Sequence, residues 1–340
     1  MRRAVDWAGT SGVFELILDR LERVGSWPRG TLAVLTYHRV DDPRARPDLF
    51  PGLVSATPAE FERQVAHLAR RMRVVSAEDL LAARRRTAVL PLRAVHITVD
   101  DAYRDFAEQA WPVLRRYGLP VTLFVPTAYP DQPGRAFWWD RLYSACMATD
   151  HRSLDLEGIG HVDLGEEPAE RLSAMISLRD RLKALEHDAA MTVVDRIEAA
   201  LEAAPAEPAV LSWGDLRDLA KEGVALAPHS RTHPLLNRLA PERLGDELAG
   251  SRADLERETG SRQPLFAYPS GAYDERAVDA VRGAGFEIAF TTNRGTWDTL
   301  EGDWLRVNRI NVGGRSSLSV VRAQMVPAAV RLGRITSNMT

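Results

Sequence analysis

The sequence predicts an α/β fold built around a parallel β-sheet. Short apolar runs alternate with amphipathic stretches of helical periodicity over most of the chain, which is the pattern of repeated β-α units. Several apolar runs end in polar residues, as happens where parallel strands present functional groups at their carboxyl ends. The 340 residues, 45% of them hydrophobic and 27% charged, suffice for one large α/β barrel or for a domain with an insertion.

The first predicted elements lead to a strand that ends in two aspartates. An amphipathic helix at 11–24, within an N-terminal segment 1–30, is expected to pack against the protein, because its small basic excess does not favour a membrane surface. A buried strand at 31–36 ends in Tyr37 and His38, and a strand at 95–99 ends in an Asp-Asp pair. The other elements predicted here are capped helices at 57–72 and from 76, a brief strand at 74–75, a helix at 103–117 and a strand at 120–126.

The alternation pauses between 131 and 209 and then resumes. We interpret 131–209 as a helical insertion between two parts of one barrel, 31–130 and 210–315; it either shapes a substrate cleft or a partner surface, or is a packing lobe. Its helical patterns cover 170–185 and 189–203. The later predicted elements are a capped helix from 212, strands at 223–227, 265–268, 286–291 and 304–312, helices at 241–259 and 274–284, and a C-terminal helix and tail at 316–340.

Composition excludes several classes of protein. The net charge of −3 provides no basic surface for nucleic acid. Cys146 is the single cysteine, so an intrachain disulfide is excluded and a buried thiol is expected. Two arginines follow Met1, but Asp6 and Glu15 interrupt the apolar region that a signal peptide requires, and no run approaches the roughly 20 apolar residues of a membrane span. We therefore expect a cytoplasmic protein.

Asp100 and Asp101 are adjacent carboxylates at the end of a predicted parallel strand. Two like charges at this range are unfavourable unless a cation lies between them or one of them is protonated. The alternative is a strand-to-helix turn in which one aspartate caps the helix at 103–117.

His229 and His233 form a second pair of possible ligands, after the predicted strand at 223–227. On a helical turn, a spacing of four places both imidazoles on one side, which suits two ligands of one divalent metal, although such a pair is often structural. Because the aspartate and histidine pairs both follow parallel strands, we expect them at the same edge of the sheet. Two histidines and one aspartate make a three-ligand set with open positions, and the other aspartate is then a candidate base.

Three segments make the chain resemble the polysaccharide deacetylase family, carbohydrate esterases that share a NodB-homology domain. They are TVDDA at 98–102 for the family pattern TFDDG, HSRTH at 229–233 for H-S/T-x-x-H, and FAYPSG at 266–271 for the third motif. The resemblance covers about 31–312 apart from the insertion. It implies a distorted (β/α) barrel of about seven strands, a divalent metal, usually Zn²⁺ with Co²⁺, Ni²⁺ or Mn²⁺ as alternatives, and hydrolysis of an N-acetyl group on an amino sugar.

The resemblance also implies residue roles. Asp101, His229 and His233 would bind the metal, and Asp100 would be the base that takes a proton from a water activated by the metal. The third-motif residues expected to contact the oxyanion or substrate, through backbone N–H near the serine, are Tyr268, Pro269 and Ser270.

The chain departs from the family pattern at three places. Ala102 replaces the glycine of the first motif, and Ala267 occupies the place of the arginine that usually steadies the base. Arg309 could replace that arginine from the last strand, or be an ordinary structural arginine. No histidine follows His233, although the family usually has a late histidine as general acid.

His38 is the best candidate for this missing acid, because an arginine cannot donate a proton at working pH. A subset of the family that resembles the deacetylases of poly-N-acetylglucosamine export systems has an early Tyr-His, like Tyr37-His38, and a circularly permuted motif order. The alternative is that His38 only packs or bonds to Asp41 or Asp42.

Three functions follow from these residues. The first is a metal-dependent hydrolase that removes an N-acetyl group from an amino sugar in a polysaccharide, an oligosaccharide or a glycan precursor. The second is hydrolysis of another C–N bond, in a formamide or ureide. The third is a catalytically impaired carbohydrate-binding protein, which the altered third motif and the missing late histidine would explain. The expected partner is an N-acetylated amino sugar; nothing supports membrane-surface association, and the sequence leaves the oligomeric state open.

Overall fold

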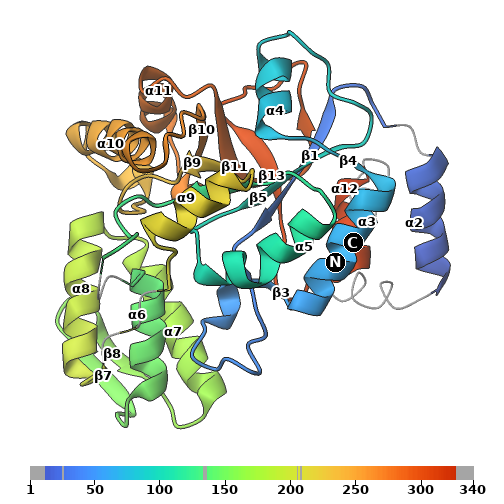
Figure 1. Cartoon of the computed structure of the whole chain (residues 1–340). Coiled ribbons are helices and arrows are strands. Elements are labelled where there is room, and N and C mark those ends of the chain that lie inside the picture. The colour runs from blue at the N-terminus through green and yellow to red at the C-terminus, as the bar shows by residue number, and fades with distance from the viewer. Residues whose placement is uncertain (1–11, 25–26, 133–135, 205, 207–208, 327–340) are drawn as a thin grey trace, which may run out of the picture.

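Seven parallel strands form a nearly closed barrel in the computed structural model, which describes residues 12–24, 27–132, 136–204, 206 and 209–326 (Figure 1). The strands are β1 (Thr31–Tyr37), β5 (Ala94–Val99), β6 (Thr122–Val125), β9 (Ala225–Pro228), β10 (Leu265–Ala267), β11 (Ile288–Arg294) and β13 (Val307–Asn311). They neighbour one another in the order β10–β11–β13–β1–β5–β6–β9. The predicted α/β barrel of about seven strands is confirmed.

Short strands add to the barrel at its margins. The additional strands are β2 (Arg39–Val40), β3 (Val54–Ala56), β4 (Arg73–Val74) and β12 (Trp297–Asp298). β4 pairs with β5 in parallel, β12 pairs with β1 in antiparallel orientation, and β2 and β3 pair with each other beside the carboxyl end of β1.

Side chains, rather than a strand ladder, join the two ends of the barrel sheet. Among the described residues β9 and β10 share no ladder. His229 donates a hydrogen bond from Nδ1 to the carbonyl of Ala267 at 2.7 Å, and the Ser261 hydroxyl donates to the carbonyl of Leu226 at 2.7 Å. His229 is therefore a bridge between the edge strands as well as a candidate ligand.

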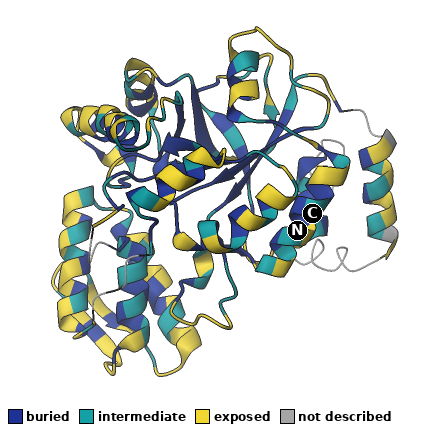
Figure 2. Cartoon of the chain, viewed as in Figure 1, coloured by how far each residue is buried: buried dark blue, intermediate teal, exposed yellow. Residues whose placement is uncertain are grey.

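Helices surround the strands (Figure 1). They are α3 (Pro58–Arg71), α4 (Ala77–Arg84), α5 (Trp111–Arg116), α9 (Trp213–Lys221), α10 (Pro241–Thr259), α11 (Glu275–Gly283) and α12 (Leu318–Met325). Thr57, Ser76 and Ser212 cap α3, α4 and α9 as predicted, each accepting a hydrogen bond from a backbone N–H of the first turn. Figure 2 shows buried strands at the centre and helices whose outward faces are exposed.

The predicted helix at 103–117 is corrected to two segments. A π-helical turn, Phe106–Ala110, precedes α5, and the Trp111 N–H bonds to the carbonyl of Phe106, five residues back. Pro112 has no N–H to donate, so the regular α-helical ladder is interrupted at this point.

The segment between the two barrel parts forms a lobe beside the barrel (Figure 1). It contains α6 (Trp138–Ala148), β7 (Ser153–Leu156), β8 (Gly160–Asp163), α7 (Pro168–Leu182) and α8 (His187–Ala200). The antiparallel β7–β8 hairpin was not predicted from the sequence. Leu178 and Ile197 of the lobe belong to the same hydrophobic cluster as Leu123 of the barrel, so the lobe and barrel share a core. Cys146 is buried in α6, as expected.

The helix α2 (Gly12–Val24) packs against the C-terminal helix α12. The buried Arg322 of α12 bonds through Nε to Glu22 at 2.9 Å, and His67 of α3 lies 3.1 Å from the same carboxylate oxygen. The expectation that this helix packs against the domain is confirmed. Within the described residues, no helix has both the length and the apolar character needed to cross a membrane. Residues 1–11 and 327–340, to which parts of the terminal predictions refer, lie outside the described residues.

Candidate active site

Asp100 and Asp101 occupy a sharp turn at the carboxyl end of β5. The Asp100 N–H donates to the carbonyl of Tyr37 at 2.9 Å, which continues the pairing of β1 and β5 beyond the strand. Asp101 (φ 72°) and Ala102 (φ 51°) then adopt left-handed backbone conformations, which are uncommon for residues with a Cβ. The reversal directs the two carboxylates to different partners. Neither caps a helix among the described residues, so the helix-cap explanation is wrong.

Asp101, His229 and His233 form a compact buried cluster. One donor atom from each lies within 4.8 Å of the other two. Asp101 Oδ1 is 3.3 Å from His233 Nε2 and 3.7 Å from His229 Nε2. That oxygen is buried and has no hydrogen-bond partner among the described residues, which is costly unless a ligand satisfies it. Two imidazole nitrogens and a carboxylate oxygen are ligands that Zn²⁺ takes in catalytic sites, so these residues fit a divalent metal.

The two histidines belong to a loop and not to the helical turn that their spacing suggested. Residues 229–233 have no helical structure, and both Ser230 (φ 60°) and His233 (φ 59°) are left-handed. The Ser230 hydroxyl accepts a hydrogen bond from the His233 N–H at 3.1 Å, which folds the loop back on itself. The two imidazoles do converge as predicted, but the loop turn at Ser230 brings them together and not a helical turn.

His229 is held in one tautomer. Its Nδ1–H donates to the carbonyl of Ala267, so Nε2 carries the lone pair that faces the cluster. Burial lowers the pKa of His229 to about 4, which keeps the imidazole neutral near pH 7. A neutral imidazole with a fixed orientation is the form that binds a metal.

Two acids of α10 brace the histidine loop, and sequence reasoning missed both. Glu247 accepts hydrogen bonds from the backbone N–H of Arg231 at 2.7 Å and of Thr232 at 2.9 Å. Asp254 accepts from Arg231 Nε at 2.9 Å and from the Thr127 hydroxyl at 3.0 Å. Both acids are buried and lie seven residues apart on one helix face. That spacing was the only available signal, and the sequence did not show what the two acids face.

Asp100 forms a buried ion pair with Arg309. The two terminal nitrogens of the guanidinium donate to the two carboxylate oxygens at 2.8 Å each, and Nε donates to the carbonyl of Thr291 at 2.7 Å. Arg309 is fully buried. Burial is the largest influence on the pKa of Asp100 and would raise it. The charge and hydrogen bonds of Arg309, together with His229 and His38, outweigh burial and hold this pKa below its ordinary value, so Asp100 is ionised.

His38 follows β1 and faces the same cavity as Asp100 and His229. Its backbone N–H donates to the Ser55 hydroxyl at 2.9 Å, and the residue is half-buried. Its imidazole makes no hydrogen bond with the residues that the structure describes. Asp41 instead accepts from the backbone of the next residue and pairs with Arg46, so bonding of His38 to its acidic neighbours does not explain its position.

The third motif contributes one of its three predicted residues to the cavity. The Tyr268 ring is buried in a separate cluster towards α10 and α11, and its hydroxyl donates to the carbonyl of Leu305 at 3.0 Å. Pro269 is buried beneath the turn, whereas Ser270 (φ 52°) is exposed and lines the cavity. The Ser270 N–H makes no hydrogen bond within the described part of the chain. The Tyr268 side chain therefore packs outside the cavity lining and supports the turn through the core.

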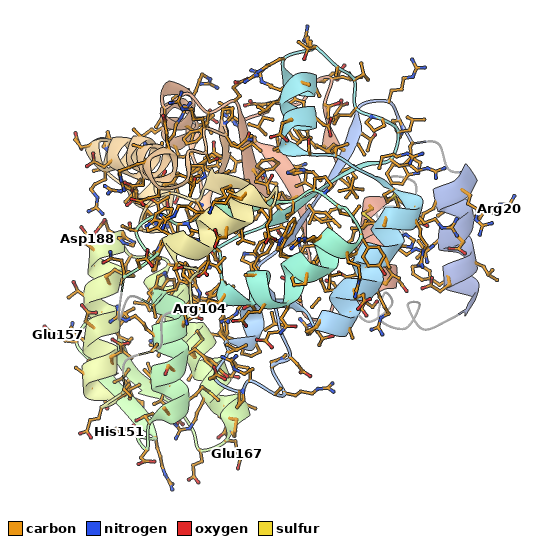
Figure 3. The ribbon with its side chains drawn as sticks, in the orientation of Figure 1. Arg20, Arg104, His151, Glu157, Glu167 and Asp188 are labelled. Carbon is orange, nitrogen blue, oxygen red and sulfur yellow. The ribbon has the colours of Figure 1, made fainter. Side chains whose placement is uncertain are left out.

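The insertion completes the cavity, which has a volume of about 90 Å³. Its lining residues from the insertion are Trp138, Trp139, Arg179 and Lys183. The Trp139 ring packs edge-on against His233 with centroids 4.8 Å apart, and its Nε1–H donates to the Tyr103 hydroxyl at 2.9 Å. The surface of the lobe carries exposed polar residues, among them His151, Glu157 and Asp188 (Figure 3). The lobe thus shapes the cleft, the first of the alternatives left open by the sequence.

The barrel and its site define an α/β-barrel protein with a candidate metal centre at the carboxyl ends of its strands. A family model described as polysaccharide deacetylase matches residues 89–289, and the chain belongs to that family. The resemblance inferred from the three motifs is confirmed. His38 and Arg309 both lie outside the matched residues.

Known relatives agree with this assignment. YxkH of Bacillus subtilis (strain 168), named for the same family, is 26% identical over 203 residues, 60% of this chain and 46% of that protein. The chain therefore spans about half the length of this curated relative.

Solved structures show the same fold. The deacetylase PplD of Streptococcus pyogenes, solved in complex with acetate, is 17% identical with a TM-score of 0.59, covering 88% of this chain and 100% of that one. IcaB of Ammonifex degensii is 19% identical with a TM-score of 0.55, covering 88% and 97%.

Proposed function

We propose that this protein is a metal-dependent hydrolase that removes an N-acetyl group from an amino sugar, within a polysaccharide, an oligosaccharide or a glycan precursor. The observation that carries the proposal is the buried Asp101–His229–His233 cluster, with its orphaned carboxylate oxygen, beside the ionised Asp100. Membership of the deacetylase family supports the reaction class.

Asp101, His229 and His233 would hold the metal, with Zn²⁺ proposed first and Co²⁺, Ni²⁺ or Mn²⁺ as alternatives. When bound, a divalent metal polarises a carbonyl and lowers the pKa of a water molecule towards neutrality. The protein fixes the ligands in advance through the Ala267 carbonyl on His229 and the Trp139 ring on His233.

Asp100 accepts the proton of the attacking water. Its carboxylate is ionised, and His229 Nε2 lies 3.9 Å from its Oδ2, so the base is adjacent to the cluster. Arg309 holds both oxygens in one orientation and prevents rotation of the carboxylate. Arg309 is thus a positioning residue that acts through Asp100.

His38 donates the proton that the leaving amine requires. An amine is expelled only when its nitrogen is protonated, and a guanidinium such as Arg309 cannot supply that proton. The imidazole of His38 lies in the cavity without a hydrogen-bond partner among the described residues, so both of its nitrogens are accessible to substrate.

The remaining cavity residues orient the substrate. The free backbone N–H of Ser270 can donate to the oxygen that becomes negatively charged as the acetyl carbon turns tetrahedral. The half-buried Trp138 ring offers an apolar face against which a sugar ring can stack.

Separate substitutions of the adjacent carboxylates Asp100 and Asp101 test the proposed roles of base and metal ligand. Protein stripped with chelator and reloaded with Zn²⁺ should bind about one metal per chain, with acetate release measured on N-acetylglucosamine oligosaccharides. Asp101→Asn should lose the metal and activity together, whereas Asp100→Asn should keep the metal and lose turnover. Equal metal binding by Asp101→Asn, or full activity of Asp100→Asn, contradicts the proposal.

A further inference from the structure

Two cations of the insertion, Arg179 and Lys183, line the same cavity as Asp100, His229 and His233. They occupy the last turn of α7 and the residue after it, and their spacing of four places them on one face of the helix. Leu182, between them in the sequence, is buried in the core that the lobe shares with the barrel. The packing of the lobe therefore positions both charges at the site.

Within the described part of the chain, the two cations differ in their partners, because Arg179 is paired with a neighbouring carboxylate and Lys183 is not. Arg179 bonds to the exposed Asp180 through Nε at 3.1 Å and Nη2 at 2.8 Å, which leaves Nη1 without a bond. Lys183 makes no ion pair and no hydrogen bond with the described residues, although it is partly buried. Burial, followed by the charge of Arg179, lowers the pKa of Lys183. Like charges four residues apart destabilise a helix, so this arrangement is not explained by stability of α7.

A further cation, Arg238, lies beside the cavity, away from the candidate metal cluster. Lys183 and His233 also line an adjoining hollow, together with His187 and the exposed Arg238. No carboxylate lines that hollow among the described residues, and Asp100 is the one that lines the main cavity. Asp100 is already paired with Arg309. The wall of the cleft thus attracts negative charge.

We propose that the substrate is an N-acetylated sugar that carries an anionic group, a phosphate or a carboxylate, and that Lys183 with Arg179 binds this group. This inference rests on the proposed function, because it places the anion relative to the amide that is hydrolysed. A neutral glycan would leave Lys183 buried and unpaired in the complex, whereas an anion would satisfy it with a charge-assisted hydrogen bond.

The chain offers a matched control. Lys183 and Lys221 are its only lysines. Lys221 is exposed at the end of α9 and pairs with Asp218 at 2.8 Å. Lys221→Met removes one positive charge from the protein without changing the cavity. Lys183→Arg keeps a positive charge in the lining of the cavity.

The test measures binding, so it does not depend on turnover. Zinc-loaded Asp100→Asn protein, alone and with Lys183→Met, Lys183→Arg or Lys221→Met, is titrated calorimetrically with three probes. They are neutral N,N′-diacetylchitobiose, N-acetylglucosamine 1-phosphate, and a disaccharide of N-acetylglucosamine and glucuronate. The quantity compared is the ratio of the Kd for the neutral probe to the Kd for each charged probe.

We expect a preference for at least one charged probe that Lys183→Met reduces about tenfold, as for loss of one charge-assisted hydrogen bond, and that Lys183→Arg largely retains. The probe that shows the effect identifies phosphate or carboxylate as the anion. An equal ratio in Lys183→Met and Lys221→Met overturns the inference, including the case where phosphate binds the metal alone. Failure of the wild-type enzyme to release acetate from any probe overturns the proposed function instead, and the binding ratio still decides the role of Lys183.

Discussion

Replacing Arg309 by Met tests whether the buried ion pair of the site is needed for the charge of Asp100. The side chain keeps its approximate length and apolar stem, but two hydrogen bonds of 2.8 Å to Asp100 and one of 2.7 Å to the Thr291 carbonyl are lost. Removing one partner of a buried pair strands the other charge, which costs about 3–5 kcal/mol. We expect the free energy of unfolding in urea at pH 7 to fall by about that amount.

The loss should depend on pH in a defined direction. In the wild type, Arg309 holds the folded-state pKa of Asp100 below its ordinary value of 3.8, so the carboxylate contributes stability above that pH and loses it as pH falls through the folded pKa. Without Arg309, burial is the dominant effect and the folded pKa of Asp100 rises above the unfolded value. The variant then loses stability as pH rises beyond about 4. The difference in free energy of unfolding between the variant and the wild type should therefore be small near pH 4 and increase towards pH 7.

Activity separates a positioning role from a merely structural one. A base with a raised pKa is ionised only at higher pH, so the acid limb of the kcat/KM profile should move to higher pH in Arg309→Met. The double variant with Asp100→Asn carries no stranded charge and should regain most of the stability lost in Arg309→Met, although it stays inactive. Wild-type stability of Arg309→Met, or an unchanged acid limb, would refute this reasoning.

Three further predictions concern other parts of the site. His38→Gln should lower turnover by about 10²–10⁴-fold with zinc content unchanged, while the exposed His151→Gln has no effect; loss of zinc in His38→Gln would contradict the assignment as acid. Glu247→Gln weakens the acceptor for two loop N–H groups and should lower zinc affinity by about 10–100-fold in a chelator competition, whereas Glu256→Gln, on the same helix, should not. Gly271→Ala places a Cβ 2.0 Å from Thr292 Oγ1 at φ +66°, and it should disturb the turn at Ser270 and lower turnover. The control Gly118→Ala has a similar φ of +64° but no atom within 4 Å of its Cβ, so it should lower the free energy of unfolding by only about 1–2 kcal/mol and leave kcat unchanged. Equal effects of the two variants would refute the steric argument.

The barrel and the Asp-His-His cluster were predictable because their signals are local. Apolar runs such as 31–36 and 95–99 are completely or almost completely buried, and burial on both faces of a strand requires a continuous apolar sequence. Asp100-Asp101 and His229 each follow directly on a strand, so the parallel topology alone brings them to one edge.

The contacts of the other site residues could not be predicted, because their partners are distant in the sequence. Arg309 was a candidate partner of Asp100, but an ordinary structural arginine remained the alternative. Arg309 reaches Asp100 across 209 positions, and only the three-dimensional order of strands shows that β13 lies beside β1. Glu247 looks like any helix acid until the loop that it braces is seen. Trp139 and Lys183 lie in an insertion whose docking against the barrel has no local sequence signature.

The alanine at position 267, where the family pattern has an arginine, can be considered together with the arginine at position 309. Ala267 ends β10, where its carbonyl holds His229 and its methyl group packs in a buried cluster with Phe290. An arginine side chain at this position would have to displace that packing, and both oxygens of Asp100 already accept from Arg309. A second guanidinium there would lack a carboxylate partner and would be buried as an unpaired charge. The one buried arginine that bonds to Asp100 thus comes from β13, and the small residue at 267 leaves the packing beside it undisturbed.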